Sequence, residues 1–332
     1  MHPALLGLIT IVAGVGGCVG YFYASNLALD NLIFPPRGPN AGRNINRANL
    51  VRPWLFLAPA LAALALYLAY PVVETLRLSL FDRDIDAYVG FANYSQMMDE
   101  PKFWEALRNN IFWLIVVPAL STTFGLLAAQ LTDRISWGNL AKSLIFMPMA
   151  ISFVGAAVIW KLIYDTRPIE QDQIGVLNAL YIFFGGTDPQ TWLTIPFWNN
   201  FFLMIVLVWI QTGFAMVILS AALRGIPEDT IEAAVIDGAG PFQIFFRVKV
   251  PQIMGTIVVV WTTITIVVLK VFDIVFTMTN GQWETQVLAN YMYDKLFRAN
   301  DWGVGSASAM VIMLLVMPIL VWNVHNARKE MR

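Results

Sequence analysis

The residues that could bind a solute are polar groups inside long apolar stretches. Gln211 and Thr212 interrupt one such stretch, and Lys270 and Asp273 follow another. An amide or a charge without a partner is costly in an apolar medium, so these side chains are candidates for contacting a polar solute. The spacing of three predicts that Lys270 and Asp273 can pair on one helical face, and the alternative is an ion pair that reaches out to the membrane interface.

The residues that could do covalent or metal chemistry are few and scattered. The two histidines, His2 and His325, lie at opposite ends of the chain, and Cys18 is the only cysteine. One thiol forms no disulfide or thiolate metal site within a chain. An acidic stretch over residues 82–105 lacks the spacing of an EF-hand, so a solvated acidic surface is predicted there. We therefore expect no catalytic residues and no metal site.

A nucleotide site is not predicted either. A phosphate-binding loop needs two glycines ahead of its lysine, and the nearest match, residues 136–143, carries Ser136 and Ala141 at those two positions. We therefore expect no cofactor in this chain, and any ATP hydrolysis has to come from another chain.

The composition indicates a membrane protein. Of the 332 residues, 58% are hydrophobic and only 13% are charged, and the mean hydropathy is +0.63. Soluble globular chains carry roughly 25% charged residues. A net charge of −1 offers no basic field for nucleic acid. These values exclude a soluble enzyme, a disordered chain and a nucleic-acid-binding protein, and they predict an all-α polytopic protein in contact with membrane lipid.

Seven stretches are long and apolar enough to cross a bilayer as helices, which takes about 20 residues. Alternating strands of a barrel are not seen. The fourth stretch is short, and Lys142 and Lys161 at its ends are predicted to extend outward to the interface. The predicted spans are 3–29, 53–73, 109–132, 143–160, 201–223, 250–269 and 302–324.

The charges of the loops predict the topology. With the N-terminus outside, the cytoplasmic segments carry 12 Lys and Arg in 74 residues, against 9 in 104 residues outside. This bias follows the positive-inside rule. The predicted organisation is an extra N-terminal transmembrane helix over 1–29, a flexible cytoplasmic linker over 30–52, a core of six transmembrane helices over 53–324 and a cytoplasmic tail over 325–332.

The loop over residues 224–251 is predicted to fold into two short helices. Pro227 suits the first turn of a helix, and the acidic residues after it complement the helix dipole. Gly238 and Gly240 then break that helix, and Pro241 can start a second one, which carries Phe242, Phe245 and Phe246. Apolar residues in such a loop indicate either a surface that docks a protein or a hairpin that lies on lipid headgroups.

The loop contains the motif Glu232-Ala-Ala-x-x-Asp-Gly-Ala, followed by Val248-x-x-Pro251. This pattern resembles the signature loop of permease subunits of bacterial ABC importers, with Val-Lys-Val-Pro in place of Ile-x-Leu-Pro. Tyr70-Pro71, Ser79-Leu-Phe, residues 89–94 and Thr279-Asn-Gly281 resemble motifs of the carbohydrate-uptake branch. The resemblance covers residues 50–330 and looks closest to maltose-permease-like alpha-glucoside permeases.

The resemblance implies a type I ABC importer permease fold, with a six-helix core plus one extra N-terminal transmembrane helix, in the cell inner membrane. It implies three kinds of partner for sugar import: a sister permease in a heterodimer, two cytoplasmic ATPase subunits that hold ATP and Mg, and a periplasmic or lipid-anchored sugar-binding protein. The residues implied to couple the chain to the ATPase are Glu232, Ala233, Ala234, Asp237 and Gly238.

In this family the sugar pocket lies on the two helices that flank the signature loop. The resemblance places the pocket helix at Gln211, Thr212 and Phe214, and Lys270 and Asp273 complete the expected substrate path. The matching stretch 264–271 is mostly aliphatic, which departs from a full sugar site and favours a pocket mainly in the sister subunit. The alternative function is a self-sufficient secondary transporter of small polar solutes.

Overall fold

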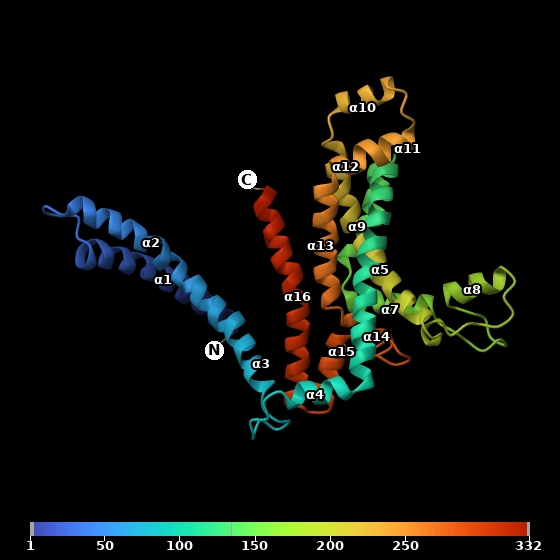
Figure 1. The fold of residues 1–332 in the computed structure, drawn as a ribbon, viewed down its shortest axis with the longest axis horizontal. Helices are drawn as coiled ribbons and strands as arrows, with labels where there is room; N and C mark the ends of the chain where they lie inside the picture. The colour runs from blue at the N-terminus through green and yellow to red at the C-terminus, as the bar shows by residue number, and fades with distance from the viewer. Residues whose placement is uncertain (1–2, 134, 331–332) are drawn as a thin grey trace. The chain divides into compact units, whose positions relative to one another are not determined.

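The computed structural model describes residues 3–133 and 135–330, and all the regular elements in this part are helices (Figure 1). The chain divides into two compact units, Met1–Glu74 and Thr75–Arg332. The all-helical architecture confirms the predicted class. It follows from the apolar composition, because lipid offers no hydrogen-bond partner for an exposed backbone group.

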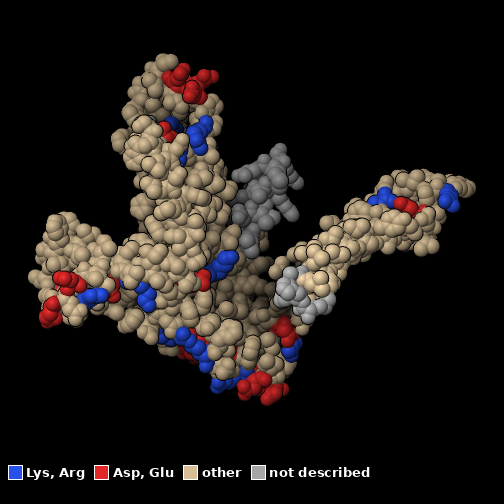
Figure 2. All heavy atoms as spheres, turned by 180° about the vertical axis from the view of Figure 1, so that it is seen from behind, with Lys and Arg blue, Asp and Glu red and all other residues tan. Residues whose placement is uncertain are grey.

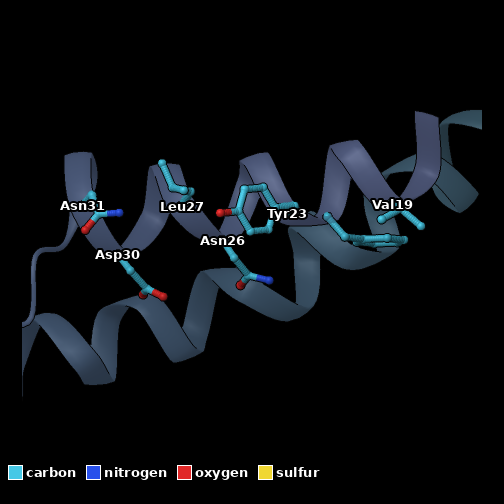
Figure 3. A pocket seen from close by; sticks show the side chains of 7 residues that line it. Val19, Tyr23, Asn26, Leu27, Asp30 and Asn31 are labelled. Carbon is cyan, nitrogen blue, oxygen red and sulfur yellow. The ribbon is translucent and has the colours of Figure 1, made fainter. Parts of the chain in front are cut away.

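The first unit is a hairpin of two long helices. Helix α1 (Pro3–Ala28) continues through η1 (Leu29–Ile33), and α2 (Ala41–Leu64) continues through η2 (Ala65–Ala69) into α3 (Tyr70–Leu78). The Tyr21 hydroxyl donates a hydrogen bond to the Leu55 carbonyl at 2.8 Å, and Arg52 forms an ion pair with Asp30 at 2.7 Å. Figure 3 shows Asn26 of α1 and Asp30 of η1 directed towards α2. The hairpin is therefore held by a few polar contacts rather than by a buried core.

The predicted linker over 30–52 is helical for most of its length. Only residues 34–40 lie outside the helices, because η1 extends to Ile33 and α2 begins at Ala41. The Asn and Arg residues of this stretch are typical of a loop. The pairing of Arg52 with Asp30 across the hairpin instead supports a helical conformation there.

The second unit is built around two long helices, α5 (Pro101–Thr132) and α9 (Trp198–Arg224), which run in the same direction and pack against each other. A β-carbon on Gly125 of α5 would lie 2.4 Å from the β-carbon of Ala215 in α9. Buried apolar side chains from both helices, such as Trp113 and Leu207, form the largest hydrophobic cluster of the described residues. The absence of a side chain at Gly125 thus permits the close crossing of α5 and α9.

The fourth predicted span is broken rather than continuous. Helices α6 (Gly138–Phe146) and η3 (Met147–Ala150) are followed by α7 (Phe153–Ile163), and their axes differ by 106°. Pro148 lies in the last turn before the break, and the Ser152 hydroxyl caps α7 by accepting from the Gly155 amide at 3.1 Å. Uniform hydropathy over 143–160 gave no sign of this bend.

The two broken halves nevertheless follow α9 along most of its length. The Lys142 ammonium donates to the Ser220 hydroxyl at 2.7 Å, and the Tyr164 hydroxyl donates to the Phe202 carbonyl at 3.0 Å. A β-carbon on Gly213 would lie 2.6 Å from the Ile145 carbonyl oxygen. Helices α6 and α7 together therefore run antiparallel to α9 and form one bent span.

Two further spans complete the second unit. Helix α13 (Met254–Leu269) packs on α5 and α9, and α16 (Trp302–Glu330) packs on α13. Short helices gather where α5 and α9 begin, which we call the α15 end: α4 (Ala92–Asp99), α8 (Val176–Phe183), α14 (Asp273–Met278), α15 (Leu288–Tyr293) and η6 (Asp294–Arg298). The opposite end, where α5 and α9 finish, we call the α10 end.

Each predicted span falls on helices, with breaks at residues 151–152 in the fourth and at residue 253 in the sixth. Within the described residues, four helices are long and apolar enough to cross a membrane, and two bent pairs raise that number to six. The apolar helix Trp302–Pro318 covers most of the seventh predicted span. The structure thus confirms where the apolar helices lie, and the orientation of the chain stays a prediction.

We predict that Gly125→Leu destabilises the second unit. The new side chain collides with Ala215, and overpacking of this kind costs about 1–3 kcal/mol. The apparent Tm of the purified chain in detergent should fall. Gly17→Leu in α1 is the matched control, because a β-carbon there meets no atom within 4 Å. Equal Tm values for the two variants contradict the close crossing.

Candidate functional site

The loop at the α10 end folds into a hairpin of short helices, as the sequence predicts. Helix α10 (Glu228–Ile236) follows Pro227, and a second helical segment consists of α11 (Pro241–Gln243), η5 (Ile244–Lys249) and α12 (Val250–Gln252). Glu228 and Asp229 lie in the first turn of α10, where negative charge is stabilised by the helix dipole. We call residues 227–252 the α10 hairpin.

Gly238 ends α10 in a left-handed conformation, with φ of +78°. The Ala239 amide donates to the Ala234 carbonyl, and the Gly238 amide donates to the Val235 carbonyl, both at 3.0 Å. These two bonds form a Schellman motif, which satisfies the last carbonyl groups of the helix. A residue with a β-carbon at position 238 would lower the stability of this conformation by about 1–2 kcal/mol. Gly238 therefore sets the direction in which the chain leaves α10.

The surface of α10 is both acidic and apolar. Glu232, Ala233 and Asp237 are exposed, Ala234 is half-buried, and Ile236 keeps 85% of its surface exposed. Figure 2 shows the acidic side chains gathered at the tip of the molecule formed by this hairpin. Val235 beside it is 58% exposed, so two large apolar side chains lie exposed together among carboxylates.

A hollow lies behind α10, between that helix and the end of α9. Glu232 lines this hollow together with Arg224 from α9 and Lys249 from η5. Glu228 also lines the hollow, so the Glu232 carboxylate stands at the border between the exposed tip and a recess that carries charges of both signs. A shift of α10 relative to α9 changes the surroundings of Glu232 directly.

A half-buried polar cluster joins α5, α6 and α9 at the base of the hairpin. The Lys142 ammonium forms an ion pair with Asp133 and donates to the Ser220 hydroxyl, and Ser220 donates to Asp133 at 3.1 Å. The predicted extension of Lys142 to the interface is wrong. Its side chain is only 17% exposed, because Asp133 and Ser220 hold it against the bundle.

The polar residues predicted within α9 differ in what they contact. The Thr212 hydroxyl donates to the Val208 carbonyl of its own helix at 2.7 Å, and Phe214 packs against the main hydrophobic cluster. Gln211 is 7% exposed, and its amide has no hydrogen-bond partner within the described part of the chain. Of these three side chains, Gln211 is therefore the one available to a solute.

Lys270 and Asp273 do not form the ion pair that their spacing suggested. Helix α13 ends at Leu269 and α14 begins at Asp273, so the two side chains do not share a helical face. No ion pair joins them within the described residues. Both instead line a hollow of about 260 Å³ between α7, α9, α13 and α14, whose other lining residues are Phe153, Leu207, Val267, Val271, Phe272 and Ile274.

This hollow lies deep along α9 rather than at its end. Leu207 is the tenth residue of the helix, about 14 Å from its start at 1.5 Å per residue. Gln211 follows Leu207 by four residues, so both face the same side of α9. Gln211 does not itself line the hollow, and it lies one helical turn from it on the same side of α9.

The α15 end carries a tethered loop that the sequence analysis missed. Residues 279–287 contain left-handed residues at Asn280, Gly281, Trp283 and Glu284. Four buried asparagines bind the backbone of this loop or of the residue after it: Asn109 donates to Glu284 and Gln286, Asn110 accepts from Leu288, Asn199 donates to Trp283 and Asn200 donates to Glu284. The two Asn-Asn pairs in the sequence were the available signal.

A second group of contacts closes the α15 end. The Tyr291 hydroxyl donates to Glu100 at 2.8 Å, and Lys295 forms an ion pair with the same carboxylate at 2.5 Å. Burial raises the pKa of Tyr291, and the hydrogen bond to Glu100 and the negative charge of Glu100 raise it further. The hydroxyl therefore remains a donor, and Glu100 links α15 and η6 to the start of α5.

Comparison with known proteins decides the family. Residues 121–329 match the family described as "Binding-protein-dependent transport system inner membrane component". This chain belongs to that family. It is 63% identical over 334 residues to the alpha-glucoside transport system permease protein AglF of Rhizobium meliloti (strain 1021). The match covers 99% of this chain and 99% of AglF.

Two other proteins resemble the permease. The osmoprotective compounds uptake permease protein GgtC of Synechocystis sp. is 45% identical over 276 residues, covering 83% of this chain and 99% of that one. A chain in the crystal structure of a bacterial ABC transporter for the acidic polysaccharide alginate shares the fold, with a TM-score of 0.72 and 20% identity over 86% of this chain and 98% of that one. The predicted permease fold and its inner-membrane, multi-pass location are confirmed.

The α10 hairpin and the hollow both fall within the matched region of the permease. The hairpin carries the residues that the sequence predicted to contact an ATPase, and the hollow carries two of those predicted to line a substrate path. The structure brings Lys270 and Asp273 together, with Gln211 one turn beyond Leu207. Thr212 and Phe214 are instead engaged with their own helix and with the core.

We predict that Lys142→Met destabilises the permease. The change leaves the Asp133 carboxylate without its cation, and the expected loss is about 1–3 kcal/mol, below that of a fully buried pair because both side chains are partly exposed. Thermal unfolding in detergent measures it. The double variant Asp133→Asn with Lys142→Met should recover most of the stability, and a double variant as unstable as the single one would argue against the cluster.

Proposed function

We propose that this permease is the transmembrane subunit of an ATP-driven sugar importer, with an alpha-glucoside or disaccharide as the solute. The 63% identity to a permease named for alpha-glucoside transport, over 99% of both chains, supports this substrate class. The chain forms the translocation path with a sister permease, as a heterodimer. A periplasmic or lipid-anchored sugar-binding protein delivers the sugar to it.

The α10 hairpin is the observation that carries the mechanism. Its exposed tip combines Glu232, Ala233 and Asp237 with Ile236, and Gly238 holds the chain direction after it. We propose that α10 inserts into a groove of one of two cytoplasmic ATPase subunits, which hold ATP and Mg. Closure of those subunits on ATP then moves α10, and the movement reaches the membrane through α9 and the Asp133–Lys142–Ser220 cluster.

The face of α9 that carries Leu207 and Gln211 supports the path for the sugar. Gln211 has an unpaired amide there, which can exchange hydrogen bonds with hydroxyl groups. Lys270 and Asp273 add a donor and an acceptor at the neighbouring hollow. Because the remaining lining is mostly apolar, the sister permease supplies the rest of the pocket.

We predict that Gly238→Val and Glu232→Ala uncouple transport. The first variant strains the chain as it leaves α10, and the second removes the carboxylate between the tip and the recess. Sugar uptake and sugar-stimulated ATPase activity in proteoliposomes should both fall at least about tenfold, the effect of some 1.4 kcal/mol at the interface. Membrane insertion should be unchanged.

Gly240→Ala is the matched control for this experiment. Its φ of −71° suits any residue, and a β-carbon there meets no atom within 4 Å. Normal uptake by both Gly238→Val and Glu232→Ala would contradict the coupling role. Uptake by the permease without any ATPase subunit would instead support a secondary transporter.

We predict that Gln211→Leu raises the KM for sugar about fivefold, because one hydrogen bond to an uncharged hydroxyl contributes about 1 kcal/mol. Initial uptake rates across sugar concentrations in proteoliposomes measure it. Thr262→Val is the control, since its hydroxyl donates only to carbonyls of its own helix. An unchanged KM in Gln211→Leu, with the ATPase still coupled, would show that Gln211 does not contact the sugar.

A further inference from the structure

The second arm of the α10 hairpin differs from α10 in direction and in character. The helical segment Pro241–Gln252 meets the spanning segment Met254–Leu269 at an angle of 71°. Because α13 crosses the membrane, a segment at that angle lies closer to the membrane plane than to its normal. This is the orientation of an interfacial helix.

One side of this segment is aromatic and exposed. Phe242 keeps 82% and Phe246 keeps 61% of its surface exposed, whereas Ile244 between them is buried at 8%. The exposed rings border a groove whose other wall is the last turn of α5. The groove is lined by Leu127, Gln130, Leu131, Pro241, Phe242, Phe245 and Phe246.

The groove continues the exposed apolar surface of a spanning helix. Leu127 and Leu131 are 44% and 65% exposed, and both belong to α5, which is long and apolar enough to cross the membrane. An acyl chain that lies along α5 therefore reaches the aromatic rings of Pro241–Gln252 without leaving apolar surface. This continuity favours a lipid over a protein as the occupant.

The charges of the hairpin also differ between α10 and the segment Pro241–Gln252. The acidic residues Glu228, Asp229, Glu232 and Asp237 all lie on α10 or at its end. Residues 241–252 contain no acidic residue, and they carry Arg247, which is exposed, and Lys249. Basic residues beside aromatic ones at a membrane surface attract anionic lipid headgroups.

We propose that Pro241–Gln252 lies in the membrane interface and that its groove against Leu127 and Leu131 binds an anionic phospholipid, with the acyl chain on Phe242 and Phe246 and the headgroup at Arg247. The hairpin then has two working arms: α10 meets a protein, and the second arm rests on the bilayer. Lipid binding of this kind does not depend on the transported solute or on a bound ATPase.

The first experiment measures depth by spin labelling. Cys18 is the only cysteine, so Cys18→Ser provides a background for Phe242→Cys and, as a matched control, for Ile236→Cys, whose native side chain is as exposed. The full chain is placed in nanodiscs of phosphatidylcholine and phosphatidylglycerol without ATPase. The label at 242 should collide more often with oxygen than with a water-soluble nickel complex, and the label at 236 should show the reverse.

Two outcomes overturn the proposal. In one, the label at 242 meets the nickel complex as often as the label at 236 does. In the other, position 242 becomes shielded only when purified ATPase subunits are added, which assigns the aromatic arm to a protein partner instead.

The second experiment measures the headgroup preference. Photoreactive phosphatidylglycerol should crosslink to the chain more than photoreactive phosphatidylcholine does, and Arg247→Gln should reduce that crosslinking about fivefold, the effect of one basic residue near an anionic surface. Arg108→Gln, an exposed arginine at the other end of α5, is the control and should not change it. Equal crosslinking of both lipids, or of Arg247→Gln and the unaltered chain, overturns the proposal.

Discussion

The close packing of α5 against α9 is the contact on which the rest of the second unit depends. Gly125 allows the two helices to approach, and each end of the pair then holds a different element. Asn109 and Asn199 fix the tethered loop at the α15 end, while Asp133 and Ser220 fix Lys142 at the α10 end. A pair of helices this tightly packed moves as one body, because packed interiors do not deform continuously. Such a body can carry a displacement from one end to the other.

Breaks in the other spans create the hollow beside this rigid pair. The bend between η3 and α7 and the gap between α13 and α14 both occur next to the middle of α9. Irregular backbone at membrane depth is tolerated where it lines a cavity rather than lipid. The same breaks bring Lys270 and Asp273 to the cavity, and the two side chains form no ion pair with each other within the described residues. A hollow that two charged residues line thus arises from interruptions in otherwise apolar helices.

The α10 hairpin combines two kinds of surface in 26 residues. Its first helix is acidic and stands clear of the bundle, and its second segment is aromatic and basic and crosses the end of α13 at a steep angle. Gly238, in the left-handed region, turns the chain between them. In the proposed arrangement, the turn lets adjacent residues contact an ATPase subunit and the bilayer, so that anchoring of the second segment would oppose a force on the first.

The sequence by itself determined the apolar helices and the two-helix hairpin, because both depend on local patterns: runs of about 20 apolar residues, Pro227 and Pro241 as helix starts, and Gly238 as a stop. Only the tertiary structure decided the 106° bend, the placement of Lys270 and Asp273 at one hollow, the asparagine tether and the cluster of Asp133, Lys142 and Ser220. Each of these depends on contacts between residues far apart in the chain. A side chain's partner across helices is set by how the helices cross, which hydropathy and spacing do not encode.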